Sequence, residues 1–385
     1  MRSTDDLRIS TRLTWLTICL SAAVYGQSFP SGSTGADGDL NITAPGVTVF
    51  TQTPVGGGTV YNFGTINVAQ GSTLKLSGAV FTQPLYFLAT GAVTIAGTID
   101  LSGQSGSTVT TAAQRSAPAP GAGGFAGGLA AFGGDGALPG LGPSGGTLGS
   151  CFGEGGAASF SGNQFLVPLI GGSGGAGGSG ASGGAGGGAL LIASSVSINV
   201  TGTITANGGA SVNNVSGAGS GGGIRLVAPA ISGTGAITAA GGSSACGGVS
   251  GVVRLEFFQD TFTGTISGNF YGATPVNVFA PAPGSQPTIM VTSIGGVAVP
   301  ANPTGSFTVP DVLLNSTSPL TVNIQASNIP LGTVPTVYFS TQNFPDQKIT
   351  ANAGLAGTLA SSTTTATVTL NPGYSIGFVT ATWKQ

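Results

Sequence analysis

Five charged residues near the repeated segments of this chain are the candidates for chemistry: Asp100, Arg225, Arg254, Glu256 and Asp260. Arg225 and Arg254 hold the same position in neighbouring repeats. Glu256 follows Arg254 by two residues and therefore lies on the same side of an extended strand. Such a cluster could serve polysaccharide cleavage. We favour a solvated row of charges that discourages sheet-edge association, because no two carboxylates occupy matching positions of neighbouring repeats.

The rest of the sequence offers little catalytic chemistry. The chain contains no histidine, so Ser-His-Asp and Cys-His nucleophiles and His-ligated zinc are excluded. The pattern G-x-S-x-G occurs at 171–175 and 180–184, but a tract so rich in Gly and Ser contains it by chance. Asp37 and Asp39 are weak calcium candidates, and a capping turn is favoured for them. We expect no catalytic residue, no cofactor and no metal.

The composition limits the classes of partner. Of 385 residues, 71 are Gly, 5% are charged and 40% are hydrophobic. So much apolar chain predicts a folded protein whose surface consists of Ser, Thr, Asn, Gln and Gly. Nine basic and eleven acidic residues form no basic patch, so nucleic acid is not expected as a partner.

Residues 1–26 are typical of a secretory signal peptide. Three arginines precede the apolar run 13–24, and small residues precede Gln27. The run is too short to span a bilayer. No later run resembles a membrane anchor, so the mature chain is expected to have no membrane span. We therefore expect a secreted or cell-surface protein.

Two cysteines remain beyond the predicted signal peptide, Cys151 and Cys246. In an oxidising compartment an even pair indicates one disulfide, and two free thiols are the alternative.

A recurring sequence motif indicates the fold that positions the candidate charged residues. Variants of Gly-Thr-Ile place an Ile at 66, 99, 204, 237 and 266, with spacings of 33, 105, 33 and 29. Each repeat holds three short apolar runs that alternate with period two. In one of them Val196, Ile198 and Val200 face one way. Gly-Gly pairs after the phrase are expected to form corners.

Stacked repeats of this kind predict a parallel β-helix over residues 27–273. One unit of three short strands cannot bury its inward face, whereas stacking builds a continuous core. A seven-stranded sandwich is the competing interpretation, and it leaves the repeated spacing unexplained.

The spacing of 105 residues indicates a glycine-rich insertion at about 104–187. Its composition is typical of a flexible linker, but the apolar run 165–170 and Cys151 lie within it. We interpret it as an elaborated loop partly ordered against the side of the helix. Glycine-rich chain packed in polyproline II form is an open alternative.

The composition and the repeat pattern of the sequence change after residue 273. Residues 274–287 form a Pro-rich linker, and strand-like runs then recur every 10–16 residues over 288–385. These runs include 288–294, 305–310, 320–327, 336–341, 365–370 and 377–383. About seven strands in this length predict an immunoglobulin-like β-sandwich. The fold class is therefore all-β.

The segments "SGGAGGGALLIASSVSINVTGTITANGG" and "GSGGGIRLVAPAISGTGAITAAGG" resemble glycine-rich secreted proteins of soil bacteria. The resemblance covers about 180–260, and 60–105 more loosely. It implies a β-helical, adhesin-like protein and brings no catalytic residues. The C-terminal 100 residues resemble an Ig-like module that follows such regions.

These observations favour an exported, non-catalytic structural or adhesive protein that contacts polysaccharide or cell-surface components. A polysaccharide-active lyase or hydrolase is the alternative, in which the charged residues would carry the reaction. Ice binding by a flat Thr array is a third hypothesis, indicated by Thr203 and Thr205, although Ala236 interrupts that array.

Overall fold

The computed structural model describes residues 27–385 except 152, 213–214, 246, 277, 279–286, 301–309, 317–318, 342–346, 371–372 and 383–385. The predicted signal peptide and most of the predicted Pro-rich linker lie outside the described residues. Almost all of the described secondary structure is strand. The helical element among these residues is the short 3₁₀ turn η1 (Ala112–Gln114).

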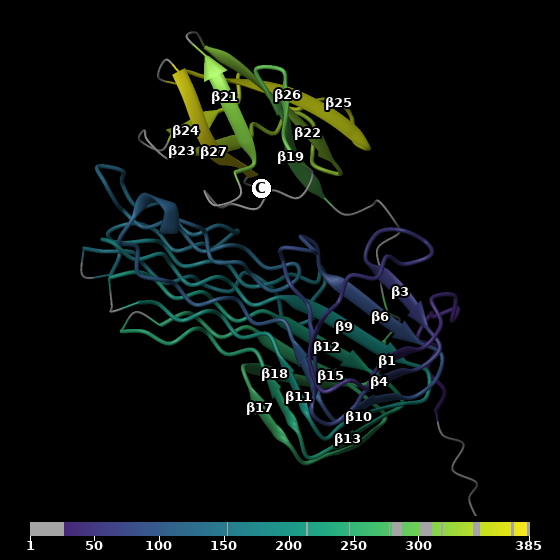
Figure 1. Cartoon of the computed structure of the whole chain (residues 1–385). Helices are drawn as coiled ribbons and strands as arrows, with labels where there is room; N and C mark the ends of the chain where they lie inside the picture. The colour runs from purple at the N-terminus through teal and green to yellow at the C-terminus, as the bar shows by residue number, and fades with distance from the viewer. Residues whose placement is uncertain are drawn as a thin grey trace, which may run out of the picture.

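Residues 40–273 form three parallel sheets of six strands each, as a parallel β-helix requires. Along the chain, successive strands pass from sheet A to sheet B to sheet C and then return to sheet A (Figure 1). Sheet A contains β1 (Leu40–Ile42), β4 (Ile66–Val68), β7 (Val93–Ile95), β10 (Ser197–Val200), β13 (Ala230–Gly233) and β16 (Gln259–Phe262). Sheet B contains β2 (Gly46–Val49), β5 (Ser72–Lys75), β8 (Thr98–Asp100), β11 (Thr203–Thr205), β14 (Ala236–Thr238) and β17 (Thr265–Ser267). Sheet C contains β3 (Val60–Phe63), β6 (Leu85–Ala89), β9 (Ala189–Ser194), β12 (Gly223–Val227), β15 (Val252–Glu256) and β18 (Asn269–Ala273).

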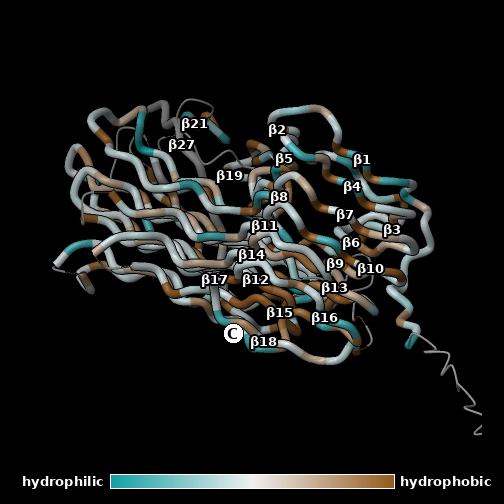
Figure 2. The backbone as a smooth tube through the Cα atoms, turned by 90° about the horizontal axis from the view of Figure 1, so that it is seen from below, coloured by the Kyte–Doolittle hydropathy of each residue, from teal (hydrophilic) through white to brown (hydrophobic). Residues whose placement is uncertain are grey.

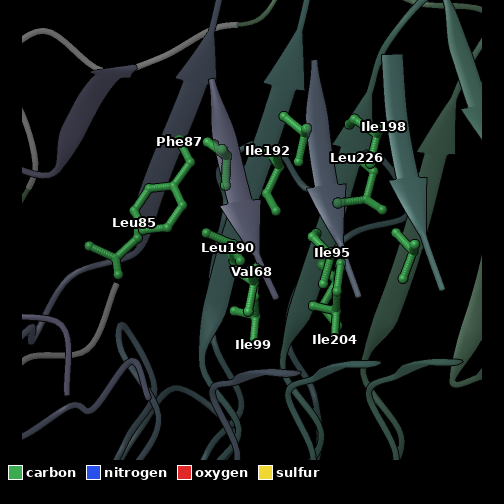
Figure 3. Packing of buried hydrophobic residues seen from close by; sticks show 14 of the residues in the cluster. Val68, Leu85, Phe87, Ile95, Ile99, Leu190, Ile192, Ile198, Ile204 and Leu226 are labelled. Atoms are coloured by element: carbon green, nitrogen blue, oxygen red, sulfur yellow. The ribbon is translucent and has the colours of Figure 1, made fainter. Parts of the chain in front are cut away.

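The core consists of apolar side chains stacked in columns inside the coils. Because side chains alternate along a strand, every second residue points inward. Figure 3 shows Ile99 and Ile204 of sheet B and Leu190 and Ile192 of sheet C, which belong to one buried cluster. These four side chains are fully buried. Removal of apolar surface from water, worth roughly 25 cal/mol per Å², holds the coils together.

The register corrects the alignment of one repeat. Ile66 lies in sheet A opposite Val93, whereas Ile99, Ile204 and Ile237 share a column of sheet B. The Gly-Thr-Ile phrase therefore marks the entry into a strand on either of two faces. The spacing of 105 residues is one step between neighbouring coils, since Ile99 pairs directly with Ile204.

Three glycine-rich segments leave the coils between sheet B and sheet C, and we call them the arms. They span 101–188, 206–222 and 239–251, after β8, β11 and β14. Backbone hydrogen bonds within them recur at every third residue. Gly172, Gly175 and Gly178 donate to Gly187, Gly184 and Ala181, and Gly219 and Gly222 donate to Gly209 and Ala206. This period equals the three residues per turn of polyproline II, so that alternative, left open by the sequence, stays a prediction.

Close approach of neighbouring backbones explains the glycines of the arms. A Cβ atom on Gly186 would collide with the carbonyl oxygen of Gly172, and one on Gly187 with that of Ala206. Gly208 and Gly209 lie within an arm and lack a positive φ. The expectation that this Gly-Gly pair forms a corner is therefore wrong. Figure 2 shows apolar residues along the strands of sheet C and paler stretches along the arms.

The C-terminal region contains two antiparallel sheets that share a hydrophobic core. The first contains β20 (Val297–Ala298), β19 (Thr288–Ile294), β22 (Leu320–Ser327), β26 (Ser361–Val368) and β25 (Ala356–Thr358). The second contains β21 (Val312–Ser316), β27 (Gly373–Thr382), β23 (Thr336–Thr341) and β24 (Gln347–Thr350). Buried residues of both sheets, such as Ile324 and Phe339, belong to one cluster. The predicted run 305–310 lies almost entirely outside the described residues.

Candidate functional site

The outward faces of sheets A and B carry columns of neutral polar side chains, which we call the polar ladders. On sheet A the column is Asn41, Asn67, Thr94, Asn199, Ser232 and Thr261. On sheet B one column is Val47, Thr73, Thr98, Thr203, Ala236 and Thr265, in which Val47 and Ala236 are the apolar members. Its neighbour is Val49, Lys75, Asp100, Thr205, Thr238 and Ser267, and Val49 begins it. Neighbouring rungs are spaced by the strand separation of about 4.8 Å.

One ion pair interrupts the neutral surface of sheet B. Lys75 Nζ lies 2.8 Å from Asp100 Oδ2, and each side chain is 26% exposed. Asp100 therefore belongs to sheet B, whereas the two arginines and Glu256 belong to sheet C. The sequence-predicted cluster of five charged residues is not assembled at one place.

Arg225, Arg254 and Glu256 do come together, on the outward side of sheet C. The two arginines pair directly in the register of β12 and β15. Arg225 Nε donates to Glu256 Oε1 over 2.9 Å, and Arg254 Nε donates to the same oxygen over 2.6 Å. The Glu256 side chain is fully buried, and those of Arg225 and Arg254 are 2% and 9% exposed. The expectation of a solvated charge row is therefore wrong for these three residues.

Neighbouring segments cover this charged cluster. Arg254 Nη1 donates to the Gln164 carbonyl over 3.3 Å, and its guanidinium carbon lies 5.4 Å from the centroid of the Phe165 ring. The Val276 N–H donates to Glu256 Oε2 over 3.1 Å. The residues 160–170 of the first arm and the start of the predicted linker thus lie against sheet C. The sequence showed the matching positions of the arginines but held no sign of this cover.

Tyr86 lies on the same outward face, beneath the same cover. It shares a buried cluster with Phe29, Leu166 and Leu191. Burial raises the pKa of Tyr86 to about 12, and the nearby positive charge of Arg225 opposes part of that rise. The outward face of sheet C is thus a second layer of core, unlike the outward faces of sheets A and B.

Asp260 occupies a position that is apolar in every earlier coil. The register of sheet A places it in the inward column after Val93, Ile198 and Ile231. Asp260 is exposed nonetheless, because β16 lies at the end of its sheet. Its Oδ1 atom accepts the Phe262 N–H over 3.0 Å. It has no contact with the arginines among the described residues.

The two aspartates weighed as calcium ligands hold the first coils together. Asp37 accepts the backbone N–H groups of Val55 and Asn62, over 2.6 and 2.5 Å. Asp39 accepts the backbone N–H and the hydroxyl of Thr65, over 2.7 and 2.9 Å. Both carboxylates thus act as capping groups, the interpretation favoured from the sequence.

Cys151 is buried and forms a disulfide. Its predicted partner, Cys246, lies outside the described residues, so the pairing of these two cysteines stays a prediction.

The described residues lack two further features. No helical segment there has the length and apolarity needed to span a bilayer. Within the same residues, no three His, Cys, Asp or Glu side chains gather closely enough to hold a metal ion. In comparisons with known proteins, no family model matches the chain, and neither does any curated protein or solved structure.

Proposed function

We propose that this protein is an exported, non-catalytic structural or adhesive protein that contacts polysaccharides or neighbouring surfaces through its polar ladders. The observation that carries the proposal is the regular, nearly uncharged surface of sheets A and B. Hydroxyl and amide groups repeated at about 4.8 Å can donate and accept many weak hydrogen bonds. Such a surface suits an extended partner that itself repeats.

The burial of Arg225, Arg254 and Glu256 supports the non-catalytic interpretation. A general acid or base must reach its substrate within hydrogen-bond distance. Glu256 is fully buried and accepts hydrogen bonds from both arginines and from Val276. A polysaccharide-active enzyme remains the alternative that the experiment below must test.

We further propose that the C-terminal sheets form an Ig-like module that acts as a spacer or docking unit. Two antiparallel sheets around one core support this assignment. Secretion, the signal peptide at 1–26 and a location at the cell surface belong to the same proposal.

The test is co-sedimentation of residues 27–385 with insoluble polysaccharides such as cellulose, chitin and xylan, with released sugar measured in the same tubes. We expect depletion of the protein without sugar release. Released oligosaccharide would replace the proposal by the enzyme alternative, and absence of depletion from every polymer would contradict adhesion to these glycans.

A matched pair of variants locates the surface. Thr94→Lys with Thr261→Lys places two charges on the exposed ladder of sheet A, and should reduce depletion several-fold. Thr321→Lys with Thr363→Lys places the same charges on exposed positions of the C-terminal sheets and should not. Equal effects of the two pairs would show that the ladders are not the contact surface.

A further inference from the structure

The polar ladder of sheet A differs from the columns of sheet B in being uncharged and unbroken. On sheet B the two columns begin with Val47 and Val49, and the Lys75–Asp100 ion pair lies within the second column. The sheet A ladder has one neutral polar member in each of six coils. In order along the stack they are Asn41, Asn67, Thr94, Asn199, Ser232 and Thr261.

The side chains of the sheet A ladder are accessible and have unused hydrogen-bonding groups. Asn41, Thr94 and Thr261 are exposed, and the other three members are half-buried. Within the described part of the chain, no side chain of this ladder forms a hydrogen bond. On sheet B, by contrast, the Thr205 hydroxyl lies 2.9 Å from the hydroxyl of Ser102. The amide and hydroxyl groups of sheet A are therefore available to a partner as donors and acceptors.

A packed core beneath the ladder fixes the spacing of its members. The inward residues Ile66, Ile198 and Ile231, which alternate with ladder residues along their strands, are buried. The parallel register is continuous from β1 to β16. Neighbouring rungs are therefore held about 4.8 Å apart. Because such a row is preorganised, binding to it costs little conformational entropy.

These features are suited to a neutral, extended partner that repeats along one direction. An uncharged row gives no electrostatic attraction to an acidic polymer or to nucleic acid. A β-1,4-linked polysaccharide is extended, carries hydroxyl groups on every sugar and advances by a length similar to one strand separation per sugar. Such a chain can place one sugar on each rung when it runs across the strands, along the direction in which the coils stack.

We propose that a neutral β-1,4-linked polysaccharide lies along the sheet A ladder, perpendicular to the strands, with one sugar on each of the six coils. The inference rests on the function proposed above, and it names the surface, the class of polysaccharide and the direction of the bound chain. Each rung contributes weakly. The rungs act together because the sugars are covalently linked, so binding at one rung raises the effective concentration at the next.

Calorimetric titration of residues 27–385 with oligosaccharides of increasing length tests the proposal. The probes are β-1,4-linked oligomers of glucose, xylose and N-acetylglucosamine, from two to about eight sugars long, and α-1,4-linked glucose oligomers of the same lengths. In at least one β-1,4-linked series, the affinity should rise about threefold or more with each added sugar up to six and by less than about twofold beyond six.

Three results of the titration would overturn the proposal. They are binding of no β-1,4-linked series, an affinity that does not depend on length, and equal affinity for the α-1,4-linked series, whose chain coils and does not match the rungs.

Blocking different rungs tests the direction of the bound chain. Thr94→Lys, at the third rung, leaves Asn199, Ser232 and Thr261 as the longest uninterrupted run. A hexasaccharide should then bind no more tightly than a trisaccharide binds the wild type. Thr261→Lys blocks only the last rung, so the hexasaccharide should bind as a pentasaccharide binds the wild type. Thr98→Lys, in the same coil as Thr94 but on sheet B, is the matched control and should leave the affinity unchanged.

A thermal melt of each lysine variant confirms that it is folded. Equal losses of hexasaccharide affinity in Thr94→Lys and Thr261→Lys, or an equal loss in Thr98→Lys, would overturn the arrangement along sheet A. If the wild type still co-sediments with an insoluble polysaccharide in that case, the function proposed above stands and only this inference fails. Absence of depletion from every polymer would reject both.

Discussion

Glu256 is the central residue of the buried charged cluster on the outward face of sheet C. It is fully buried, and both arginines donate to one of its oxygens. Removing one partner of a buried ion cluster leaves uncompensated charge, which costs far more than loss of an exposed pair. The positions of these residues in the sequence showed that they share a face, but their burial depends on the cover from residues 160–170 and 276.

The Glu256→Gln variant should therefore be strongly destabilised. We expect the free energy of unfolding to fall by about 3–5 kcal/mol, because two buried arginines lose their common counter-charge. Urea unfolding followed by circular dichroism measures this. Asp100→Asn, which breaks the partly exposed pair with Lys75, is the control and should cost at most about 1 kcal/mol. Equal losses in the two variants would show that the sheet C cluster is accessible to water.

Tyr86 gives the molecule a stability change at high pH. The phenol has a pKa of about 12 when folded, against 10.0 for the ordinary side chain. Between these values the unfolded chain releases the proton while the folded chain keeps it. The stabilising contribution is thus complete below pH 10 and is lost as the pH rises to 12, by about 1.4 kcal/mol per pH unit.

Comparison of the wild type with Tyr86→Phe isolates this contribution. We expect the difference in unfolding free energy between the two proteins to change between pH 10 and pH 12, with the wild type losing more. Tyr271→Phe, at an exposed ring, should follow the wild type. A pH-independent difference between wild type and Tyr86→Phe would mean that the phenol is accessible to water in the folded protein.

At the scale of elements, alternation predicted some strands well. The predicted runs at 320–327 and 336–341 coincide with β22 and β23, because period-two alternation requires a sheet with one buried face. Alternation failed at Val196, which was expected to face inward and is 52% exposed, since β10 begins only at Ser197. A strand's first residue depends on where the preceding turn ends, which local pattern does not specify.

The arms could be predicted less well, because composition does not distinguish a flexible glycine-rich linker from a packed one. A glycine-rich segment is packed when its glycines face a neighbouring backbone. Composition does not show which segments are neighbours. The three-residue spacing of donors at Gly172, Gly175 and Gly178 becomes meaningful only when their acceptors are known. The sequence contained the necessary glycines but not the pairing.

Packing in the arms predicts a strong contrast between two glycine substitutions. Gly186→Ala places a methyl group against the carbonyl of Gly172 and should cost about 1–3 kcal/mol or more, because backbone cannot move aside easily. Gly136→Ala, in the same arm, meets no atom within 4 Å and is the matched control. Thermal unfolding measures both. Similar melting temperatures for the two variants would contradict the close packing of the arms.

At the scale of the whole molecule, the sixth coil leaves the core incompletely covered. Phe270 is 47% exposed, although Val253 in the same inward column is fully buried. Among the described residues, the strands β16, β17 and β18 each lie at the end of their sheet, with no further strand paired to them. Edges of this kind associate unless something prevents it, and an inward-pointing charge such as Asp260 is one such device.

Asp260→Ile should therefore promote self-association. The substitution continues the apolar column of Ile198 and Ile231 to the open edge, so a second copy can bury it. Size-exclusion chromatography with light scattering should show concentration-dependent growth in mass. Gln259→Ile adds the same side chain at the neighbouring outward position. Its mass should stay that of the wild type at every concentration. Association of both variants alike would point to general hydrophobicity rather than to the inward column.

The pairing of Ile99 with Ile204 also sets the order in which the coils can form. Most neighbouring coils join strands about 25 to 33 residues apart, whereas this step closes 105 residues. The additional loop-closure entropy is about 1 kcal/mol, and contacts distant in sequence form slowly. The first three coils and the last three can each fold through contacts that are local in sequence. The pairing between the third and fourth coils forms late. Until it does, β8 and β11 are both open edges, and this interval is when the newly made chain is most exposed to misassociation.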